Sequence, residues 1–309
     1  MALFRRSGRP SQVPSWCAWF SPAEWQAFSE AVTAFVQDSG SEPVEIGPEQ
    51  TIRLGSTEGI RYPVDLATLA AREHRLPRKQ WRADVARYLA LHRDAAAQWQ
   101  RLSRADFAEA RSLLMPKIFR ADALPDEESV TREVGHELAA AAVLRMNGGV
   151  YLPTREQIGR WGVSEDELWN TALRNLGVEA CETERGGSGA SPSVVVTGPG
   201  EFGSAQVLRA AELLGHPAPH GFLAATPSED TVVLVVIDGP GLHTSAAAME
   251  MYGRQLWEQS EPQLRLSPGV LWVHEGRIES VGVELPAKDG SRPGVITGSQ
   301  RFVDLLESF

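Results

Sequence analysis

The chain has 309 residues, a formal net charge of −10 and a pI near 5.3. This charge argues against nucleic acid as the main partner, because phosphate binding needs a basic surface, and it suits a protein that binds a basic protein partner. Apolar residues make up 42% of the chain, enough for one large domain or two medium ones.

The sequence holds no sign of a membrane segment or an export signal. Residues 1–12 carry positive charge without the apolar core of a signal peptide, and no apolar run approaches the roughly 18 residues of a transmembrane helix. The two cysteines, Cys17 and Cys181, are expected to be reduced structural thiols, with a disulfide between them as the open alternative. We therefore expect a soluble, cytoplasmic protein.

The first hundred residues are expected to be mostly helical. After a flexible tail over 1–14, the run Ser21-Pro22-Ala23-Glu24 predicts a capped helix start, and Ser39-Gly40 its end. Two short strands within 43–54, joined by a turn at 47–50, and helices over about 64–74 and 78–98 complete this region. The buried face of the first helix is expected to consist of Trp25, Phe28, Val32 and Phe35.

The middle of the chain mixes helix and strand signals. Residues 105–114 favour a helix and 115–119 a strand, in which Pro116 is typical of a sheet edge. The alanine run at 139–142 favours a helix by propensity, whereas Asn147-Gly148 is the strongest short hairpin signal. We choose the hairpin for 138–153, followed by a short helix over 154–161.

The best-specified helix of the chain begins after Trp161. Ser164 is expected at its N-cap, with Glu167 closing a capping box, and Gly177 is expected as a left-handed stop. This helix carries no evident chemistry, so we expect it to organise the fold. Its apolar face is expected to be Leu168, Trp169, Ala172, Leu173 and Leu176.

Short strands and helices alternate after this helix without a regular βαβ rhythm. We expect strands over 178–181, 194–197, 221–225, 232–237, 270–273 and 278–285, a polar turn over 226–230, and helices over 203–214, 242–260 and 300–307. The fold class is therefore α+β, a mostly helical N-terminal part followed by mixed strands, hairpins and packed helices. We divide the chain into a flexible tail over 1–14, a helix-rich region with a small hairpin over 15–105, and an α+β main domain over 106–309.

One motif matches the glycine pattern of a dinucleotide loop. Gly198-Pro199-Gly200-Glu201-Phe202-Gly203 has the G-x-G-x-x-G spacing between an expected strand and an expected helix. Glu201 would place a carboxylate beside the pyrophosphate, and no acidic residue follows about 20 positions on. We therefore interpret the motif as a glycine-rich turn and expect no cofactor.

The remaining polar groups show no metal-binding or catalytic pattern. His216 and His220 lie in a proline-containing loop, His92 lies at the edge of an apolar stripe, and we expect no metal site. Asp230 is expected to pin the turn at 226–230, and no catalytic residue is assigned.

Several motifs occur in an order that suggests a relationship. They are Pro116-Lys117-Ile118, Trp161-Gly162-Val163-Ser164 with Glu167-Leu168 and Ala172-Leu173-Arg174-Asn175-Leu176, Gly203-Ser204-Ala205, and Thr226-Pro227-Ser228-Glu229-Asp230. This order resembles the DUF1444 family of uncharacterised bacterial proteins, also called YtpQ or UPF0354. The last motif is similar to the family's P-x-R-D turn, with Glu229 in place of the arginine. The resemblance implies a cytoplasmic α+β architecture over about 60–250, and it implies no activity.

A well-patterned core without a convergent chemical constellation favours a non-enzymatic protein-binding protein. We expect an adaptor or immunity-type protein whose acidic surface covers a basic partner. Two alternatives stand beside it: an enzyme with a dispersed site, either a hydrolase or a nucleotide-handling protein, and a structural subunit of an assembly. The candidate interaction surface consists of Ser164, Glu167, Asn175, Glu229 and Asp230.

Overall fold

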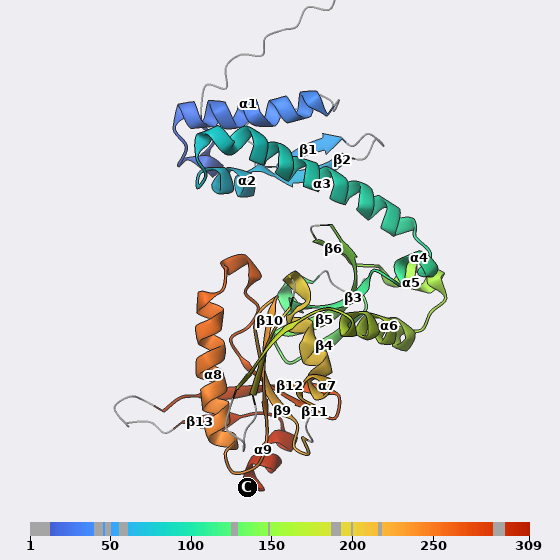
Figure 1. The fold of residues 1–309 in the computed structure, drawn as a ribbon, viewed down its shortest axis with the longest axis vertical. Helices are drawn as coiled ribbons and strands as arrows, with labels where there is room; N and C mark the ends of the chain where they lie inside the picture. The colour runs from blue at the N-terminus through green and yellow to red at the C-terminus, as the bar shows by residue number, and fades with distance from the viewer. Residues whose placement is uncertain are drawn as a thin grey trace, which may run out of the picture. The chain divides into compact units, whose positions relative to one another are not determined.

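The computed structural model describes residues 13–39, 46, 51–55, 61–124, 129–147, 149–186, 193–198, 200–215, 218–286 and 294–309. The chain forms two compact units (Figure 1). The N-terminal unit comprises Met1–Arg104 and Met146–Val150, and the C-terminal unit comprises Ala105–Arg145 and Tyr151–Phe309. The expected α+β class, with a mostly helical N-terminal part, is confirmed. The expected tail over 1–14 lies outside the described residues except for its last two.

Helices dominate the N-terminal unit, where α1 and α3 lie side by side (Figure 1). The predicted start of α1 is confirmed: the Ser21 hydroxyl accepts from the Glu24 amide at 3.3 Å, and the Glu24 carboxylate accepts from the Ser21 amide at 2.7 Å. Trp25, Phe28 and Val32 are buried as expected, and Phe35 is half-buried. The elements are η1 (Ser15–Cys17), α1 (Pro22–Asp38), β1 (Thr51–Gly55), β2 (Arg61–Asp65), α2 (Leu66–Glu73), η2 (Arg78–Gln80) and α3 (Trp81–Arg104).

The hairpin of this unit differs from the prediction. β1 pairs antiparallel with β2, so the segment expected to start a helix at residue 64 is still a strand there. The reason is a cap that the prediction missed: the Asp65 carboxylate accepts from the Ala67 amide at 2.9 Å and starts α2 at Leu66. The predicted turn at 47–50 lies outside the described residues.

Two antiparallel sheets form the C-terminal unit. The larger has the order β13-β12-β11-β9-β10-β8-β7, and the smaller has the order β3-β5-β4, with β6 beside β5. The first half of the unit contains α4 (Phe107–Ala110), β3 (Leu114–Arg120), η3 (Ala121–Ala123), β4 (Thr131–Val134), β5 (Leu138–Met146), β6 (Gly149–Tyr151), α5 (Arg155–Trp161), α6 (Glu165–Gly177) and β7 (Glu182–Gly186). The second half contains β8 (Ser193–Thr197), η4 (Gly200–Phe202), η5 (Ser204–Arg209), α7 (Ala210–Leu214), β9 (Phe222–Ser228), β10 (Thr231–Val236), α8 (Leu242–Gln259), η6 (Pro262–Leu264), β11 (Val270–His274), β12 (Arg277–Glu284), β13 (Val295–Thr297) and α9 (Gln300–Glu307).

The larger sheet buries one face under α8 and α9. Alternate residues of a strand point to the same face, and Val270 and Trp272 of β11 both enter this core. They pack there with Met249 of α8, Val281 of β12 and Phe302 of α9. The other face of the sheet is therefore the one that remains for the smaller sheet and α6.

Two strand predictions are confirmed in the smaller sheet. The alanine run lies in β5, and the hairpin to β6 turns near Asn147, although Gly148 lies outside the described residues. Tertiary packing overrides helix propensity here, because the small side chains at 140–142 are buried between neighbouring elements. Pro116 lies in β3, which is an edge strand as expected.

The helix α6 matches its prediction at one end only. The Ser164 hydroxyl accepts from the Glu167 amide at 3.1 Å, but in the described part of the chain no bond from the Ser164 amide to the Glu167 carboxylate closes the expected capping box. Leu168, Trp169, Ala172 and Leu176 are buried as expected, and Leu173 is half-buried. Gly177 is not a left-handed stop: it is helical, and Val178 caps the helix in a right-handed conformation. The glycine makes room for a side chain instead, because a Cβ there would lie 3.0 Å from the Arg209 guanidinium.

Other boundaries also differ from the expected ones. The strand expected over 178–181 begins only at Glu182, and the helix expected over 105–114 shortens to α4 because 114 already pairs in β3. Thr226–Ser228, expected in a turn, belongs to β9 and is buried, so only Glu229 and Asp230 form the turn to β10.

Candidate functional site

The five residues of the predicted interaction surface do not form one cluster. Ser164 and Asn175 lie eleven positions apart on α6, a separation of roughly 16 Å along a helix. The side-chain amide of Asn175 donates to the backbone carbonyls of Arg111 and Leu114, at 2.7 Å each, and so holds the start of β3. Ser164 is occupied as the helix cap, and the Glu167 side chain is exposed.

Asp230 pins the turn between β9 and β10, as its position suggested. Its carboxylate accepts from the Ser228 hydroxyl at 2.6 Å and from the Thr231 hydroxyl at 3.0 Å. These two bonds engage Asp230 in holding the turn.

The glycine-rich motif packs against this turn. The Gly198 amide donates to the Asp230 carbonyl at 2.8 Å, and the Ser204 amide donates to the Glu229 carbonyl at 2.9 Å. A Cβ on Gly203 would overlap the Asp230 carbonyl. The glycine at 203 therefore serves a close approach between two backbone segments.

Substitution of Gly203 by alanine is expected to destabilise the C-terminal unit by roughly 2–3 kcal/mol, because the added methyl overlaps backbone atoms that have little room to shift. The matched control is Gly159→Ala, in the interior of α5, where an added Cβ meets open space. That variant is expected to stabilise the protein by roughly 0.5–1 kcal/mol. Denaturant unfolding measures both, and equal stabilities for the two variants would contradict this account of the loop.

A buried lysine joins three segments at the same place. Lys117 of β3 is only 3% exposed, and its ammonium lies 2.7 Å from a Glu201 carboxylate oxygen and 2.8 Å from one of Glu229. The Phe119 ring lies 5.4 Å from the ammonium. A buried charge needs such partners, so this ion cluster ties β3 to the glycine-rich loop and to the β9–β10 turn. We call these three charged residues the lysine cluster.

The cysteines and histidines show no metal-binding arrangement in the described ranges. Cys17 and Cys181 are both free thiols, and burial raises the pKa of Cys17 to about 11. Burial also raises the pKa of Cys181, whose sulfur accepts a hydrogen bond from the side-chain amide of Gln206 at 3.1 Å. His220 packs edge-on against Phe309 at 4.9 Å, whereas His216 lies outside the described residues.

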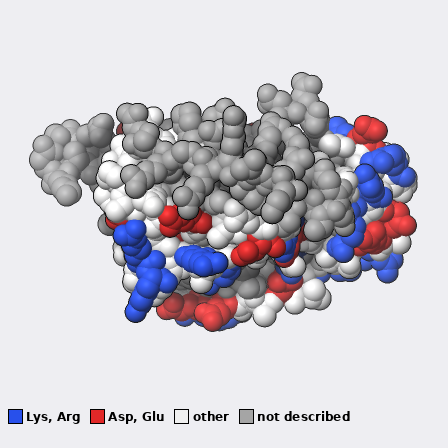
Figure 2. Space-filling view, turned by 90° about the horizontal axis from the view of Figure 1, so that it is seen from above, with Lys and Arg blue, Asp and Glu red and all other residues white. Residues whose placement is uncertain are grey.

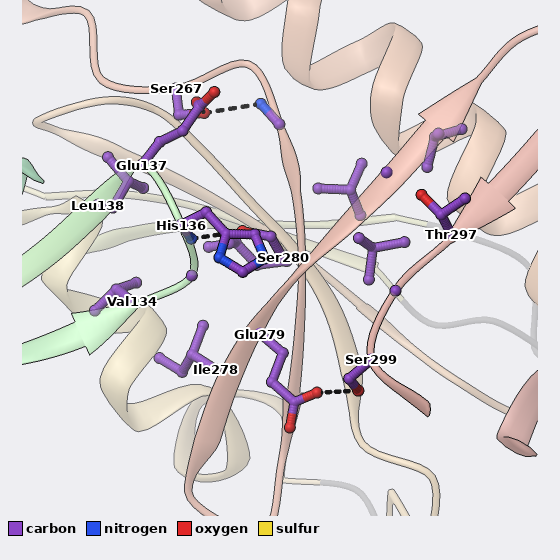
Figure 3. Close-up of a pocket in the computed structure, with 18 of the residues that line it drawn as sticks. Val134, His136, Glu137, Leu138, Ser267, Ile278, Glu279, Ser280, Thr297 and Ser299 are labelled. Carbon is purple, nitrogen blue, oxygen red and sulfur yellow. Dashed lines mark hydrogen bonds between the residues drawn. The ribbon is translucent and has the colours of Figure 1, made fainter. Parts of the chain in front are cut away.

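Two adjoining cavities lie in the C-terminal unit and were not expected from the sequence. The small cavity, of about 540 Å³, is lined by apolar and charged side chains, and the large cavity, of about 910 Å³, lies along β12 (Figure 3). Both are lined by Glu133, Arg277, Ile278 and Glu279, so they meet at these residues. The apolar walls of the small cavity come from Trp169, Leu173, Val207, Leu208, Val273 and Ile278.

The turn between β4 and β5 forms one wall of the large cavity by docking on β12. The His136 amide donates to the Ser280 hydroxyl at 2.8 Å, and the Gly135 amide donates to the Ile278 carbonyl at 3.3 Å (Figure 3). Gly135 has φ of 71°, and a Cβ on it would overlap the Ser280 hydroxyl. Only glycine fits this approach without strain.

Most arginines around the cavities have acidic partners. Arg254 pairs with Glu250, Arg301 lies 3.3 Å from Glu279, and Arg132 lies 3.6 Å from Asp166. Arg132 also covers the Trp169 ring at 4.6 Å. Arg277 differs, because its guanidinium has no ionic or hydrogen-bonded partner among the residues that the structure describes.

Charges of both signs also mix in the N-terminal unit. Figure 2 shows basic and acidic side chains next to each other on the face that it presents. Within this unit, Arg72 lies 2.7 Å from Asp84, and Arg93 lies 3.1 Å from Asp94. In the described part of the chain, no helix combines the length and the apolar character needed to cross a membrane.

Comparisons with protein-family models, with curated proteins and with solved structures give no significant match. The resemblance to the DUF1444 family therefore stays a prediction.

Proposed function

We propose that this chain is a non-enzymatic protein-binding protein of the adaptor or immunity type, and that it binds its partner at the small cavity. The observation that carries this proposal is a cavity of about 540 Å³ that combines charged residues with apolar walls, among them the half-buried Leu173 and Leu208. Partly exposed apolar side chains gathered in a concave site are typical of places that receive a partner's anchor residue.

The charges beside the small cavity indicate the chemistry of the partner. The first turn of α6 carries Glu165, Asp166 and Glu167, and the Asp166 side chain is 90% exposed. Asp166 is also the neighbour of Arg132 on the rim of the cavity. A partner segment with one large apolar side chain and adjacent lysine or arginine residues would match both features, and the net charge of −10 favours such a partner.

Cellular location and family are part of the same proposal. We propose a cytoplasmic protein, which two free cysteines support because oxidising compartments favour disulfides. Membership of the DUF1444 family is proposed on the order of motifs from Pro116 to Asp230.

Replacing Leu173 by lysine is expected to abolish partner recovery, because it puts a positive charge into an apolar wall that faces a basic partner. The matched control is Leu213→Lys, at a half-buried leucine of α7 that lines neither cavity. The tagged full-length chain and both variants are used in native pull-downs read by quantitative mass spectrometry, after thermal unfolding has shown that they fold.

The expected result is one stoichiometric protein that wild type and Leu213→Lys retain, that Leu173→Lys loses, and that elutes at high salt. Equal recovery of that protein with Leu173→Lys, or recovery of no stoichiometric protein, would overturn the proposal.

A structural subunit of an assembly is the second candidate, because the N-terminal unit exposes two large aromatic side chains. Trp19 is 48% exposed and Trp99 is 53% exposed. Burial of these rings in an assembly would require a native species larger than a monomer. Light scattering on the purified chain tests this, and a monomeric mass would exclude a self-assembling subunit.

A further inference from the structure

The large cavity adjoins the proposed partner site and has the size of a small-molecule site. Its volume of about 910 Å³ falls within the range of roughly 300–1,000 Å³ that is usual for ligand pockets. Its walls combine apolar side chains, such as Val134, Leu138 and Ile278, with a few polar groups (Figure 3). This mixture suits a ligand with an apolar part and a charged part.

Two opposite charges at the junction of the cavities lack partners among the residues that the structure describes. Neither the Arg277 guanidinium nor the Glu133 carboxylate has an ionic or hydrogen-bonded partner in the described ranges, although both line the large cavity. The Gly135-to-Ile278 backbone bond holds the end of β4 against β12, so it brings these two side chains to the same region from opposite strands. The charges of the other acidic residues in the wall are already engaged: Glu250 by Arg254, Glu279 by Ser299 and Arg301, and Glu137 by a hydrogen bond from Ser267.

The Ser280 hydroxyl adds a donor to the wall of the large cavity. It accepts from the His136 amide at 2.8 Å, which fixes the position of its oxygen and leaves its own proton to donate. It lies three residues from Arg277 along β12, and alternate residues of a strand face opposite sides, so it is placed for a polar group of the ligand other than the one at the guanidinium.

We propose that the large cavity binds a small zwitterion of the amino-acid class with an apolar side chain. Arg277 binds its carboxylate, Glu133 binds its ammonium group, and the apolar side chain packs on Val134, Leu138 and Ile278. This site shares Glu133, Arg277 and Ile278 with the small cavity, whereas Leu173 lines the small cavity alone. Calorimetry with free amino acids tests the ligand site and the pull-down with Leu173→Lys tests protein binding, so either proposal can fail alone.

The test is isothermal titration calorimetry on the full chain with L-valine, L-leucine and L-phenylalanine as probes. At least one of them is expected to bind, whereas its N-acetyl derivative and its amide, which lack one charge each, are expected to bind roughly tenfold to a hundredfold more weakly. The variants Arg277→Gln and Glu133→Gln are expected to weaken the intact amino acid by a similar factor. The matched control, Arg174→Gln, changes an exposed arginine of α6 that lines neither cavity, and it should bind as wild type does.

Three outcomes would overturn the proposal. The first is that none of the three amino acids gives a heat of binding up to about 10 mM, which corresponds to a binding free energy weaker than about −3 kcal/mol. The second is that the capped derivatives bind with the same affinity as the intact amino acid. The third is that Arg277→Gln binds the amino acid with unchanged affinity.

Discussion

Replacing Glu73 by glutamine is expected to remove a loss of stability that the N-terminal unit suffers as pH rises. Glu73 ends α2 and is fully buried beside Asp84 of α3. Burial and, to a lesser extent, the neighbouring Asp84 carboxylate raise the pKa of Glu73 to about 8, although Arg72 and Arg87 partly oppose the shift. At neutral pH the Glu73 carboxyl is therefore mostly protonated and donates to Asp84.

The sign of the effect follows from proton binding. Between the ordinary pKa of 4.5 and the folded value of about 8, the native unit holds a proton that the unfolded chain releases. Stability therefore falls through this window as pH rises, by at most roughly 1.4 kcal/mol per pH unit. Asp84 acts in the opposite direction. Burial raises its pKa, but hydrogen bonds from Arg72 and Glu73 outweigh burial and lower the pKa overall. The stability that the Asp84 carboxylate contributes is therefore lost as the pH falls below its ordinary pKa of 3.8.

Hydrogen exchange of α2 and α3 amides in the full-length protein, measured from pH 5 to about 9 and corrected for intrinsic exchange, reports on this unit alone. The wild-type amides are expected to lose protection from exchange as the pH rises across this range. In Glu73→Gln their protection is expected to be constant, because glutamine carries no titrating proton. The matched control, Glu30→Gln, changes an exposed glutamate of α1 and should keep the wild-type slope. An unchanged slope in Glu73→Gln would show that the buried carboxyl is not the titrating group.

Removing the charge of Lys117 is expected to cost the C-terminal unit roughly 3 kcal/mol, because Lys117→Met leaves Glu201 and Glu229 without their shared cation. This loss of stability lies at the lower end of the range for a broken buried ion pair. The reason is that the side chains of Glu201 and Glu229 are 27% and 21% exposed and so stay in partial contact with water. Methionine matches the length of lysine, so packing around β3 changes little.

The control is a triple variant with Lys117→Met, Glu201→Gln and Glu229→Gln. It removes all three charges of the lysine cluster together and is expected to recover most of the lost stability, because the penalty comes from unpaired charge rather than from lost packing. Denaturant unfolding measures both variants. A triple variant as unstable as Lys117→Met alone would contradict this account, because it would show that unpaired charge is not the source of the loss.

Local signals in the sequence predicted helix starts well. At Ser21 and Ser164 the cap and the amide it serves lie three residues apart, so the pattern can be seen without knowing the fold. Strand pairing is different, because the partner of a strand is chosen by packing far along the chain. This is why the pairing of β1 with β2 was missed and why the start of β7 was placed too early.

The candidate site was less accessible to sequence analysis for the same reason. Lys117 lies 84 residues from Glu201 and 112 residues from Glu229, and only the folded sheets bring them together. One signal was present, a single lysine within the otherwise apolar strand at 115–119, since a charge in such a place needs partners. Glu133 and Arg277 carry no comparable signal, because exposed charged residues in strands are common.

The composition of the N-terminal unit has a consequence for synthesis on the ribosome. That unit includes Met146–Val150, and the Asn147 amide donates to the Gln98 side chain at 3.0 Å. A nascent chain that has emerged only as far as Arg104 therefore lacks part of the unit to which its helices belong. Vectorial folding of this protein is expected to pause with the N-terminal helices incomplete until residue 150 has left the exit tunnel, by which time β3 to β5 have already emerged.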